Sequence, residues 1–255
     1  PSYFSKRSGF VINQLSGGGC EHMGNFPTFP VKGKLKMSPD NILNYRINIS
    51  EEKGHAGYYE AMVQEDIKAK LTVTERTGMA SYEYPADQQY GTVIIGGGIS
   101  ATPIEQAAIV ITAPNKCEGY AEGGNFCGLR TPYKVYFVAE FDTDALESGT
   151  WKRNELKPNT TFAEGEYSGV YFTFDVNKKK NIQYKIGVSY VSVENARENL
   201  KAENTGWDFL QIQNQAESKW NHYLGKIEVE GTNPDRTTQF YTHLYRSFTR
   251  TYVVM

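Results

Sequence analysis

The chain lacks a continuous apolar segment of the length that crosses a membrane. A membrane-spanning helix needs about 20 predominantly apolar residues, and no run of even about 18 occurs in the sequence. The first seven residues, PSYFSKR, also lack the apolar core of a secretion signal, so such a signal was either removed or never included. We therefore expect no membrane span.

Cysteine and histidine are scarce, with 3 and 4 residues respectively. Cys20, Cys117 and Cys127 do not make a full disulfide set. Cys117 and Cys127 flank a glycine-rich stretch and could pair, but free thiols fit the spacing equally well. The spacing is not that of metal ligands, and no histidine cluster accompanies it, so the sequence predicts no metal-ligand set in this chain.

An excess of positive charge is also absent, because the formal net charge is −2. Proteins that hold nucleic acid neutralise phosphates with lysine and arginine, which requires a basic surface. Nucleic acid is therefore not an expected partner.

Aromatic residues are abundant, with 18 Tyr and 13 Phe among the 255 residues. Tyrosine is favoured in strands and presents a flat amphipathic ring, on which the C–H faces of a sugar can stack. The same residues also suit half-buried strand positions that bind nothing. Together with 24 Gly and 10 Pro, they indicate a β-rich chain with many turns.

Alternation of apolar and polar residues predicts strands from about residue 67 onward, whereas residues 1–60 hold many turn residues and look irregular. Many short strands at close intervals, without a fixed repeat, indicate an antiparallel sandwich or barrel. The predicted strands cover residues 67–74, 80–84, 92–95, 108–112, 133–141, 170–175 and 183–190.

The period becomes helical after Val193. Residues 194–200 predict a first helix with Ser192 as its N-cap. Apolar residues then recur every three or four positions from Trp207 to Ile227, as on one helix face. A last helix is predicted over residues 238–251, with Asn233 as cap and Pro234 at the first helical position. Its apolar stripe has nothing after it to pack on, so we expect a helical domain to follow.

Two glycine-rich segments, 16–27 and 119–128, are the candidate ligand-contacting segments, because glycine lets a backbone approach a ligand closely. On spacing alone, an ordinary loop is the favoured interpretation of the first segment, and a long hairpin connection is that of the second. The candidate sugar-binding residues in them are Gly18, Gly19, Cys20, Glu21, His22, Asn25, Tyr120 and Asn125.

Glycoside hydrolysis needs two carboxylates, and no pair of them stands out. Glu140 and Asp142 flank Phe141 at a strand end and should face the same side, but such residues are most often solvated surface charges. We assign no catalytic residue in this chain.

An ordered series of motifs resembles glycoside hydrolase family 92. Residues 15–20 (LSGGGC) are similar to the family's HLSGxG segment, and residues 188–196 (VSYVSVENA) to its GISYVSVENA segment. Further similar segments occur in the family's order: 57–59 (GYY), 69–78 (AKLTVTERTG), 136–142 (YFVAEFD), 148–151 (SGTW), 207–208 (WD), 220–221 (WN), 227–231 (IEVEG) and 240–245 (FYTHLY).

The resemblance implies an exo-acting, inverting, calcium-dependent α-mannosidase that trims mannose-containing glycans, with α-1,2 linkages the expected substrate. It implies a mainly β fold: a large antiparallel β-sandwich of the galactose-mutarotase-like supersandwich type, followed by linker helices that lead to an (α/α)6 barrel. The barrel would hold most of the calcium ligands and the catalytic acid and base, and it would be the sandwich's main partner. The implied location is the bacterial periplasm, the cell surface or outside the cell.

The expected domains are a sandwich over residues 1–193 and a helical linker with the start of the catalytic domain over residues 194–255. Three departures from the family pattern accompany them. The chain stops at the first barrel-directed helices, an expected upstream segment (TFPGA…PFGM) is absent, and Gln14 stands where the family has histidine.

Two other functions remain open from the residues themselves. One is a stand-alone carbohydrate-binding module without catalysis, and the other is a structural cell-surface sandwich without a ligand.

Overall fold

Two antiparallel β-sheets face each other in the computed structural model, which describes residues 9–13, 23–40, 49–126, 128–231 and 233–249. The smaller sheet has five strands, in the order β1 (Thr28–Lys32), β6 (Tyr90–Gly96), β13 (Ser168–Asp175), β10 (Glu147–Lys152) and β11 (Glu155–Pro158). The larger sheet has nine strands, in the order β12 (Phe162–Glu164), β7 (Ile104–Ala113), β8 (Lys116–Phe126), β9 (Leu129–Phe141), β14 (Asn181–Ser189), β5 (Thr77–Glu83), β4 (Ile67–Val73), β3 (Tyr58–Val63) and β2 (Ile49–His55).

The hydrophobic core lies between the sheets, because alternate residues of each strand point inward. Phe141 on β9 packs on Phe172 and Phe174 of β13 in the opposite sheet, with ring centroids 4.9 and 5.1 Å apart. Burial of each such ring contributes about 1.5–3 kcal/mol relative to an exposed position. The predicted antiparallel β-sandwich is therefore confirmed.

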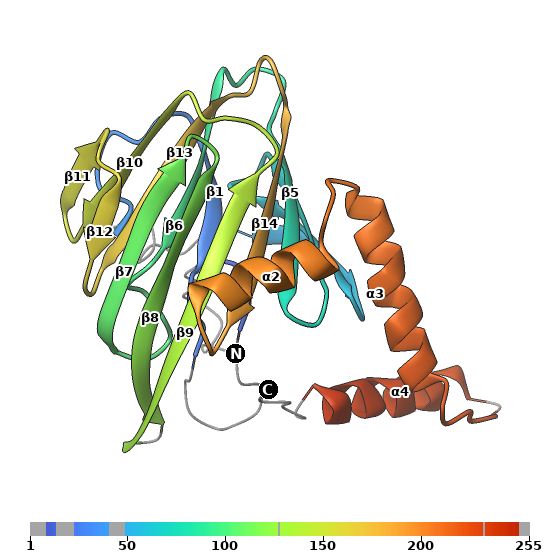
Figure 1. Ribbon diagram of the computed structural model, residues 1–255. Coiled ribbons are helices and arrows are strands. Elements are labelled where there is room, and N and C mark those ends of the chain that lie inside the picture. The colour runs from blue at the N-terminus through green and yellow to red at the C-terminus, as the bar shows by residue number, and fades with distance from the viewer. Residues whose placement is uncertain (1–8, 14–22, 41–48, 127, 232, 250–255) are drawn as a thin grey trace.

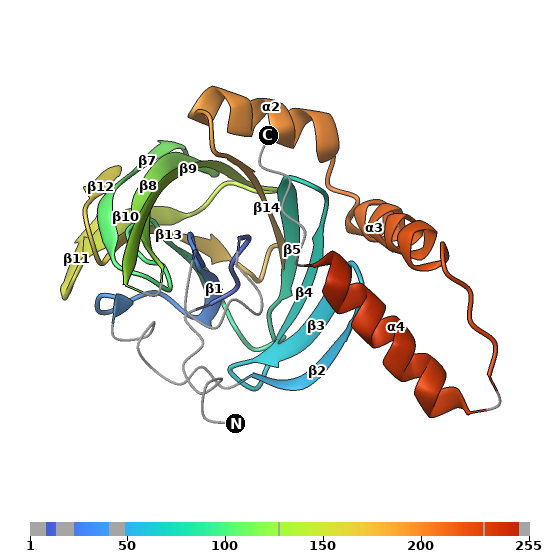
Figure 2. The ribbon, with the colours of Figure 1, turned by 90° about the horizontal axis from the view of Figure 1, so that it is seen from below.

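Three helices lie outside the larger sheet, on the side away from the smaller one (Figures 1 and 2). They are α2 (Val193–Glu203), α3 (Phe209–Leu224) and α4 (Pro234–Phe248). α2 packs its apolar side chains Ala196 and Leu200 on Val138 of β9. α4 contacts α3 through ring pairs such as Trp220 and Tyr245, whose centroids are 4.8 Å apart, and it has no buried residue.

The predicted helix caps are confirmed. The Ser192 hydroxyl accepts a hydrogen bond from the backbone N–H of Asn195, and the Asn233 side chain accepts from the N–H groups of Asp235 and Arg236. All seven predicted strands are present, as β4, β5, β6, β7, β9, β13 and β14. The last strand ends at Ser189 and α2 begins at Val193, while the division into domains at that point stays a prediction.

Two sequence expectations were wrong. Residues 119–128 were read as a long hairpin connection, but residues 119–126 belong to strand β8 (Lys116–Phe126). Its glycines mark a close backbone approach: a Cβ on Gly119 would lie 2.2 Å from the carbonyl oxygen of Ala108 on β7. Residues 1–60, read as irregular, contain β1, β2 and the start of β3. β1 was not predicted because it contains Pro30, a residue typical of turns. β2 was not predicted because its side chains are mostly exposed and include the charged residues Glu51, Glu52 and Lys53.

β2 is also bulged, because its register with β3 shifts between Ser50 and Lys53. Within the bulge Glu51 has a φ of 52°, in the left-handed region. The bulge bends the outermost strand of the larger sheet.

We predict that Gly187→Ala destabilises the protein by about 1–3 kcal/mol, because it overpacks the seat of α2. A Cβ at this position on β14 would lie 2.5 Å from the carbonyl oxygen of Ala196 and 2.9 Å from Cβ of Leu200. Urea unfolding followed by circular dichroism measures the effect. Gly206→Ala is the control, since the nearest atom to its Cβ is 4.0 Å away; equal stability of the two variants would contradict the described packing.

Candidate functional site

The candidate sugar-binding residues fall into three groups. Gly18, Gly19, Cys20, Glu21 and His22 lie outside the described residues. Asn25 lies in a buried polar cluster next to that segment. Tyr120 and Asn125 belong to strand β8, where Asn125 stands opposite Arg130 of β9.

Asn13 and Asn25, which are 12 residues apart in the sequence, bind each other. The side-chain Oδ1 of Asn13 accepts from the backbone N–H of Asn25 at 2.8 Å, and its Nδ2 donates to Oδ1 of Asn25 at 3.1 Å. The backbone N–H of Gly24 also donates to the carbonyl of Asn13 at 2.8 Å. Residues 13 and 25 are therefore fixed side by side.

Two tyrosines complete this cluster, which we call the Asn25 cluster (Asn13, Asn25, Tyr133 and Tyr190): Tyr133 lies on β9, and Tyr190 directly follows β14. The Tyr133 hydroxyl donates to Oδ1 of Asn25 at 2.9 Å, and Nδ2 of Asn13 donates to the Tyr190 hydroxyl at 3.4 Å. Asn25 is fully buried, and Tyr190 is 40% exposed. Among the described residues, Nδ2 of Asn25 is a buried donor without a hydrogen-bond partner.

Burial raises the pKa of Tyr133 above its ordinary value of 10.0, and this effect exceeds the lowering by the hydrogen bond with Asn25. The Tyr133 hydroxyl therefore remains a proton donor at neutral pH. Since it donates to Oδ1, it also fixes the orientation of the Asn25 amide.

The backbone beside Asn25 adopts an uncommon conformation. Met23 and Phe26 have φ values of 58° and 56°, in the left-handed region that residues other than glycine seldom adopt. The backbone N–H of Ala101 donates to the Met23 carbonyl at 2.9 Å and holds this conformation. Strained backbone of this kind is concentrated at functional sites.

Tyr120 lies on the other side of the larger sheet. It pairs with Tyr136 of β9, whereas the Asn25 cluster includes Tyr133, three residues earlier. Side chains three positions apart on a strand point to opposite faces. The Tyr120 ring is covered by the Lys134 ammonium group, 4.0 Å from the ring centroid. The structure thus does not bring Tyr120 together with Asn25.

The two carboxylates near Phe141 form ion pairs. Glu140 binds Lys116 at 3.0 Å, and Asp142 binds Lys179 at 2.7 Å. Cys117 is a buried free thiol, and Cys127, with which it could pair, lies outside the described residues. Burial raises the pKa of Cys117 far above its ordinary value, which keeps the thiol protonated.

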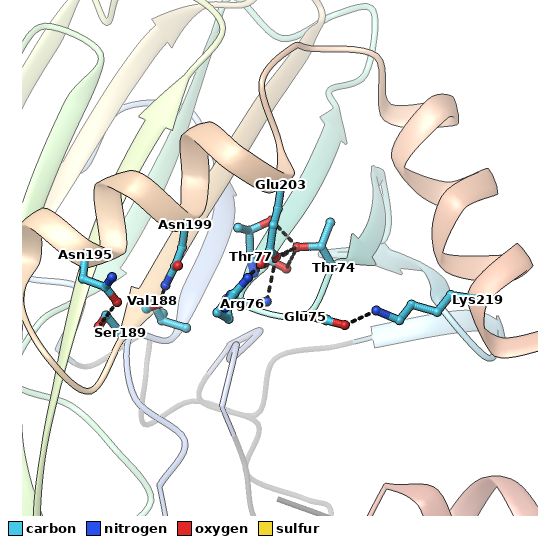
Figure 3. Close-up of polar contacts among 10 residues, drawn as sticks. All are labelled: Thr74, Glu75, Arg76, Thr77, Val188, Ser189, Asn195, Asn199, Glu203 and Lys219. Carbon is cyan, nitrogen blue, oxygen red and sulfur yellow. Dashed lines mark hydrogen bonds and ion pairs between the residues drawn. The ribbon is translucent and has the colours of Figure 1, made fainter. Parts of the chain in front are cut away.

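Sequence reasoning missed a second polar cluster, at the turn between β4 and β5 (Figure 3). Glu203, in the last turn of α2, accepts hydrogen bonds from the Thr74 hydroxyl at 2.5 Å, from the backbone N–H of Arg76 at 2.9 Å and from Nε of Arg76 at 2.6 Å. Burial acts to raise the pKa of Glu203, but these hydrogen bonds together lower it below its ordinary value. The sequence feature that could have indicated this cluster is the polar TERTG segment at residues 74–78.

A metal site requires several His, Cys, Asp or Glu side chains close together. Among the described residues, no three His, Cys, Asp or Glu side chains gather in an arrangement that could hold a metal ion. These residues therefore do not offer a calcium cradle. In the same part of the chain, no helix has the length and apolar character needed to cross a membrane.

Two family models match the chain consecutively. The glycosyl hydrolase family 92 N-terminal domain matches residues 3–189, and the glycosyl hydrolase family 92 catalytic domain matches residues 195–254. An uncharacterized secreted glycosidase of Arthroderma benhamiae is 25% identical to the chain, with alignment over 95% of this chain and 35% of that protein.

Solved structures give the same relationship. The family GH92 inverting mannosidase BT2199 of Bacteroides thetaiotaomicron is 26% identical, with a TM-score of 0.76 over 88% of this chain and 30% of its own. The family GH92 α-mannosidase BT3965 of the same organism is 24% identical, with a TM-score of 0.80 over 94% of this chain and 34% of its own, which shows the shared fold. The chain thus spans about a third of the length of these relatives.

We predict that Tyr133→Phe lowers the free energy of unfolding by about 1 kcal/mol, because it removes one donor from the buried Oδ1 of Asn25. It should also speed hydrogen exchange at the backbone N–H groups of Gly24 and Asn25. Urea unfolding and exchange followed by mass spectrometry provide the two measurements. Tyr167→Phe, at a tyrosine that is 42% exposed, is the control, and an equal effect of both variants would argue against the cluster.

We also predict a pH dependence from Glu203. Because its folded-state pKa lies below the ordinary value of 4.5, its carboxylate adds stability above pH 4.5, and this contribution is lost as pH falls through the folded-state pKa. The stability difference between the parent chain and Glu203→Gln should be largest near pH 7 and shrink below pH 4.5. Urea midpoints across this range measure it, with Glu198→Gln on the exposed side of α2 as the control. A difference that stays constant with pH would contradict the role given to the carboxylate.

Proposed function

This chain belongs to glycosyl hydrolase family 92, and from that membership we propose that the whole protein is an exo-acting α-mannosidase. It would remove terminal α-linked mannose, with α-1,2 linkages as the preferred substrate, and invert the anomeric configuration. The observation that carries the proposal is that a sandwich and the first helices of a catalytic domain follow each other in one chain. The inverting activity named for the relative BT2199 supports it.

In this proposal the sandwich contributes sugar contacts and the rest of the protein contributes the chemistry. An inverting glycosidase needs a general acid and a general base about 6.5–9.5 Å apart, with a water molecule between them. Glu140, Asp142 and Glu203 are each bound to cationic or hydroxyl partners within this chain, and we assign none of them as the acid or the base. The acid and the base are therefore expected outside these residues.

The Asn25 cluster is the proposed sugar-facing part of the sandwich. The Tyr190 ring is 40% exposed, and its hydroxyl accepts from Nδ2 of Asn13, which also donates to the buried Asn25. A C–H face of a sugar could stack on the exposed part of this ring. The flanking residues 18–22 are proposed to extend this contact surface.

The helices α3 and α4 are proposed to dock on the (α/α)6 barrel of the same protein. Leu210, Tyr223 and Ile227 are 62%, 38% and 49% exposed, and α4 buries none of its residues. Several large apolar side chains exposed on neighbouring segments are typical of a surface that another domain covers.

Calcium is the proposed cofactor, and its ligands would come from the barrel because the described residues offer no cradle. When bound, it would help to hold the mannose ring in a distorted shape. Mannose-containing N-glycans are the proposed substrates. Such glycans are found outside the cytoplasm, so we propose a periplasmic, surface or secreted location, in line with the secreted relative.

The full-length protein should release mannose from α-1,2-mannobiose, and proton NMR of the first product should show the β-anomer, because inversion converts an α-linkage into β-mannose. Chelation of calcium should abolish turnover, and added calcium should restore it. An α-anomer as first product would contradict inversion.

Residues 1–255 alone serve as the control and should not hydrolyse an aryl α-mannoside in calcium buffer. If the full-length protein binds mannobiose without cleaving it, the chain is instead part of a carbohydrate-binding module. If it neither binds nor cleaves, a structural sandwich is the remaining function.

A further inference from the structure

The turn between β4 and β5 contacts both α2 and α3. Glu203 of α2 accepts three hydrogen bonds from Thr74 and Arg76, and Lys219 of α3 forms an ion pair with Glu75 (Figure 3). Three consecutive residues of one turn therefore hold two helices.

These contacts connect the parts that match different family models. Thr74, Glu75 and Arg76 lie within the N-terminal domain match, residues 3–189, whereas Glu203 and Lys219 lie within the catalytic domain match, residues 195–254. The turn is thus an attachment point of the helical part on the sandwich.

The two contacts differ in strength because they differ in burial. The Glu203 side chain is 14% exposed and has three donors, two of them from Arg76. Lys219 and Glu75 are 49% and 54% exposed, and an ion pair so exposed to solvent contributes little. Charge-assisted hydrogen bonds to a sheltered carboxylate are the stronger constraint.

The direction of α2 depends on this constraint. Apolar packing of Ala196 and Leu200 on Val138 holds the helix against the sheet, but hydrophobic contact is non-directional and leaves small rotations possible. Asn199 donates to the Val188 carbonyl near the middle of the helix, and Glu203 is attached to the turn at its end. Two polar attachments one turn apart fix the direction in which the chain continues toward α3.

We propose that Glu203 is a positioning residue which, through Thr74 and Arg76, fixes the helical domain relative to the sandwich. This inference rests on the proposed function, since the catalytic groups of the helical domain would have to meet the Asn25 cluster at a shared substrate. A shift of about 1 Å between groups that share a substrate can reduce the rate about a hundredfold.

The test is Glu203→Gln in the full-length protein, because the variant keeps the shape of the side chain and removes its charge. We expect kcat/KM for α-1,2-mannobiose to fall at least about tenfold. We also expect faster hydrogen exchange in α3, which does not touch Glu203, while β9 and β14 stay protected. A merely local role would change exchange in α2 alone.

Glu198→Gln, an equal charge change on the exposed side of α2, is the control and should match the parent protein in both measurements. Thr74→Val serves if Glu203→Gln does not fold, because it removes one of the three donors to Glu203, together with the contacts of the Thr74 hydroxyl with Thr77, and leaves both Arg76 donors. It should show smaller changes in the same direction. Unchanged exchange in α3 would overturn the positioning role. This readout does not require turnover, so a full-length protein without mannosidase activity would overturn the proposed function and leave the positioning role to be decided by exchange.

Discussion

Mutual burial of the two sheets is the constraint on which the rest of the structure depends. Each sheet has one apolar face, and neither face is stable in water, so the sheets must cover each other. Phe141 in the larger sheet and Phe172 in the smaller one are fully buried at this interface. The strands that carry them are therefore fixed in register, and the loops at their ends are fixed with them.

The larger sheet has a second requirement, because β9 and β14 also carry apolar or small residues on their outer face. The apolar side chain of Val138 must be shielded from water, and Gly187, which has no side chain, leaves space for a helix to pack there. α2 provides the cover, so the same helix that begins the helical part also completes the sandwich. The two regions that match separate family models are for this reason physically continuous.

Most of the fold could be predicted from the sequence because its strands and helix ends depend on residues that are neighbours in the sequence. The alternation in 67–74, the buried run in 133–141 and the caps Ser192 and Asn233 depend on neighbouring residues, and each was confirmed. Strands whose local sequence does not look like a strand were missed. In β8, glycine has a low strand propensity, but Gly119 is needed because the backbone of β7 lies too close for a side chain.

The candidate site was less predictable for the same physical reason. Asn25 could be named, but Tyr133, which donates to it, lies on β9, 108 residues away along the chain. Tyr190, which accepts from Asn13, follows β14. The contact of Arg76 with Glu203 spans 127 residues. Such partners follow from the register of the larger sheet, which the sequence pattern does not specify by itself.

The bulged strand β2 has a consequence for the protein in concentrated solution. A regular outermost strand offers a row of unpaired N–H and C=O groups on which a strand of another molecule can assemble. In β2 the left-handed turn at Glu51 interrupts that row, and Glu51, Glu52 and Lys53 place charge along it. Growth of the larger sheet from one molecule to the next is thereby disfavoured at this edge.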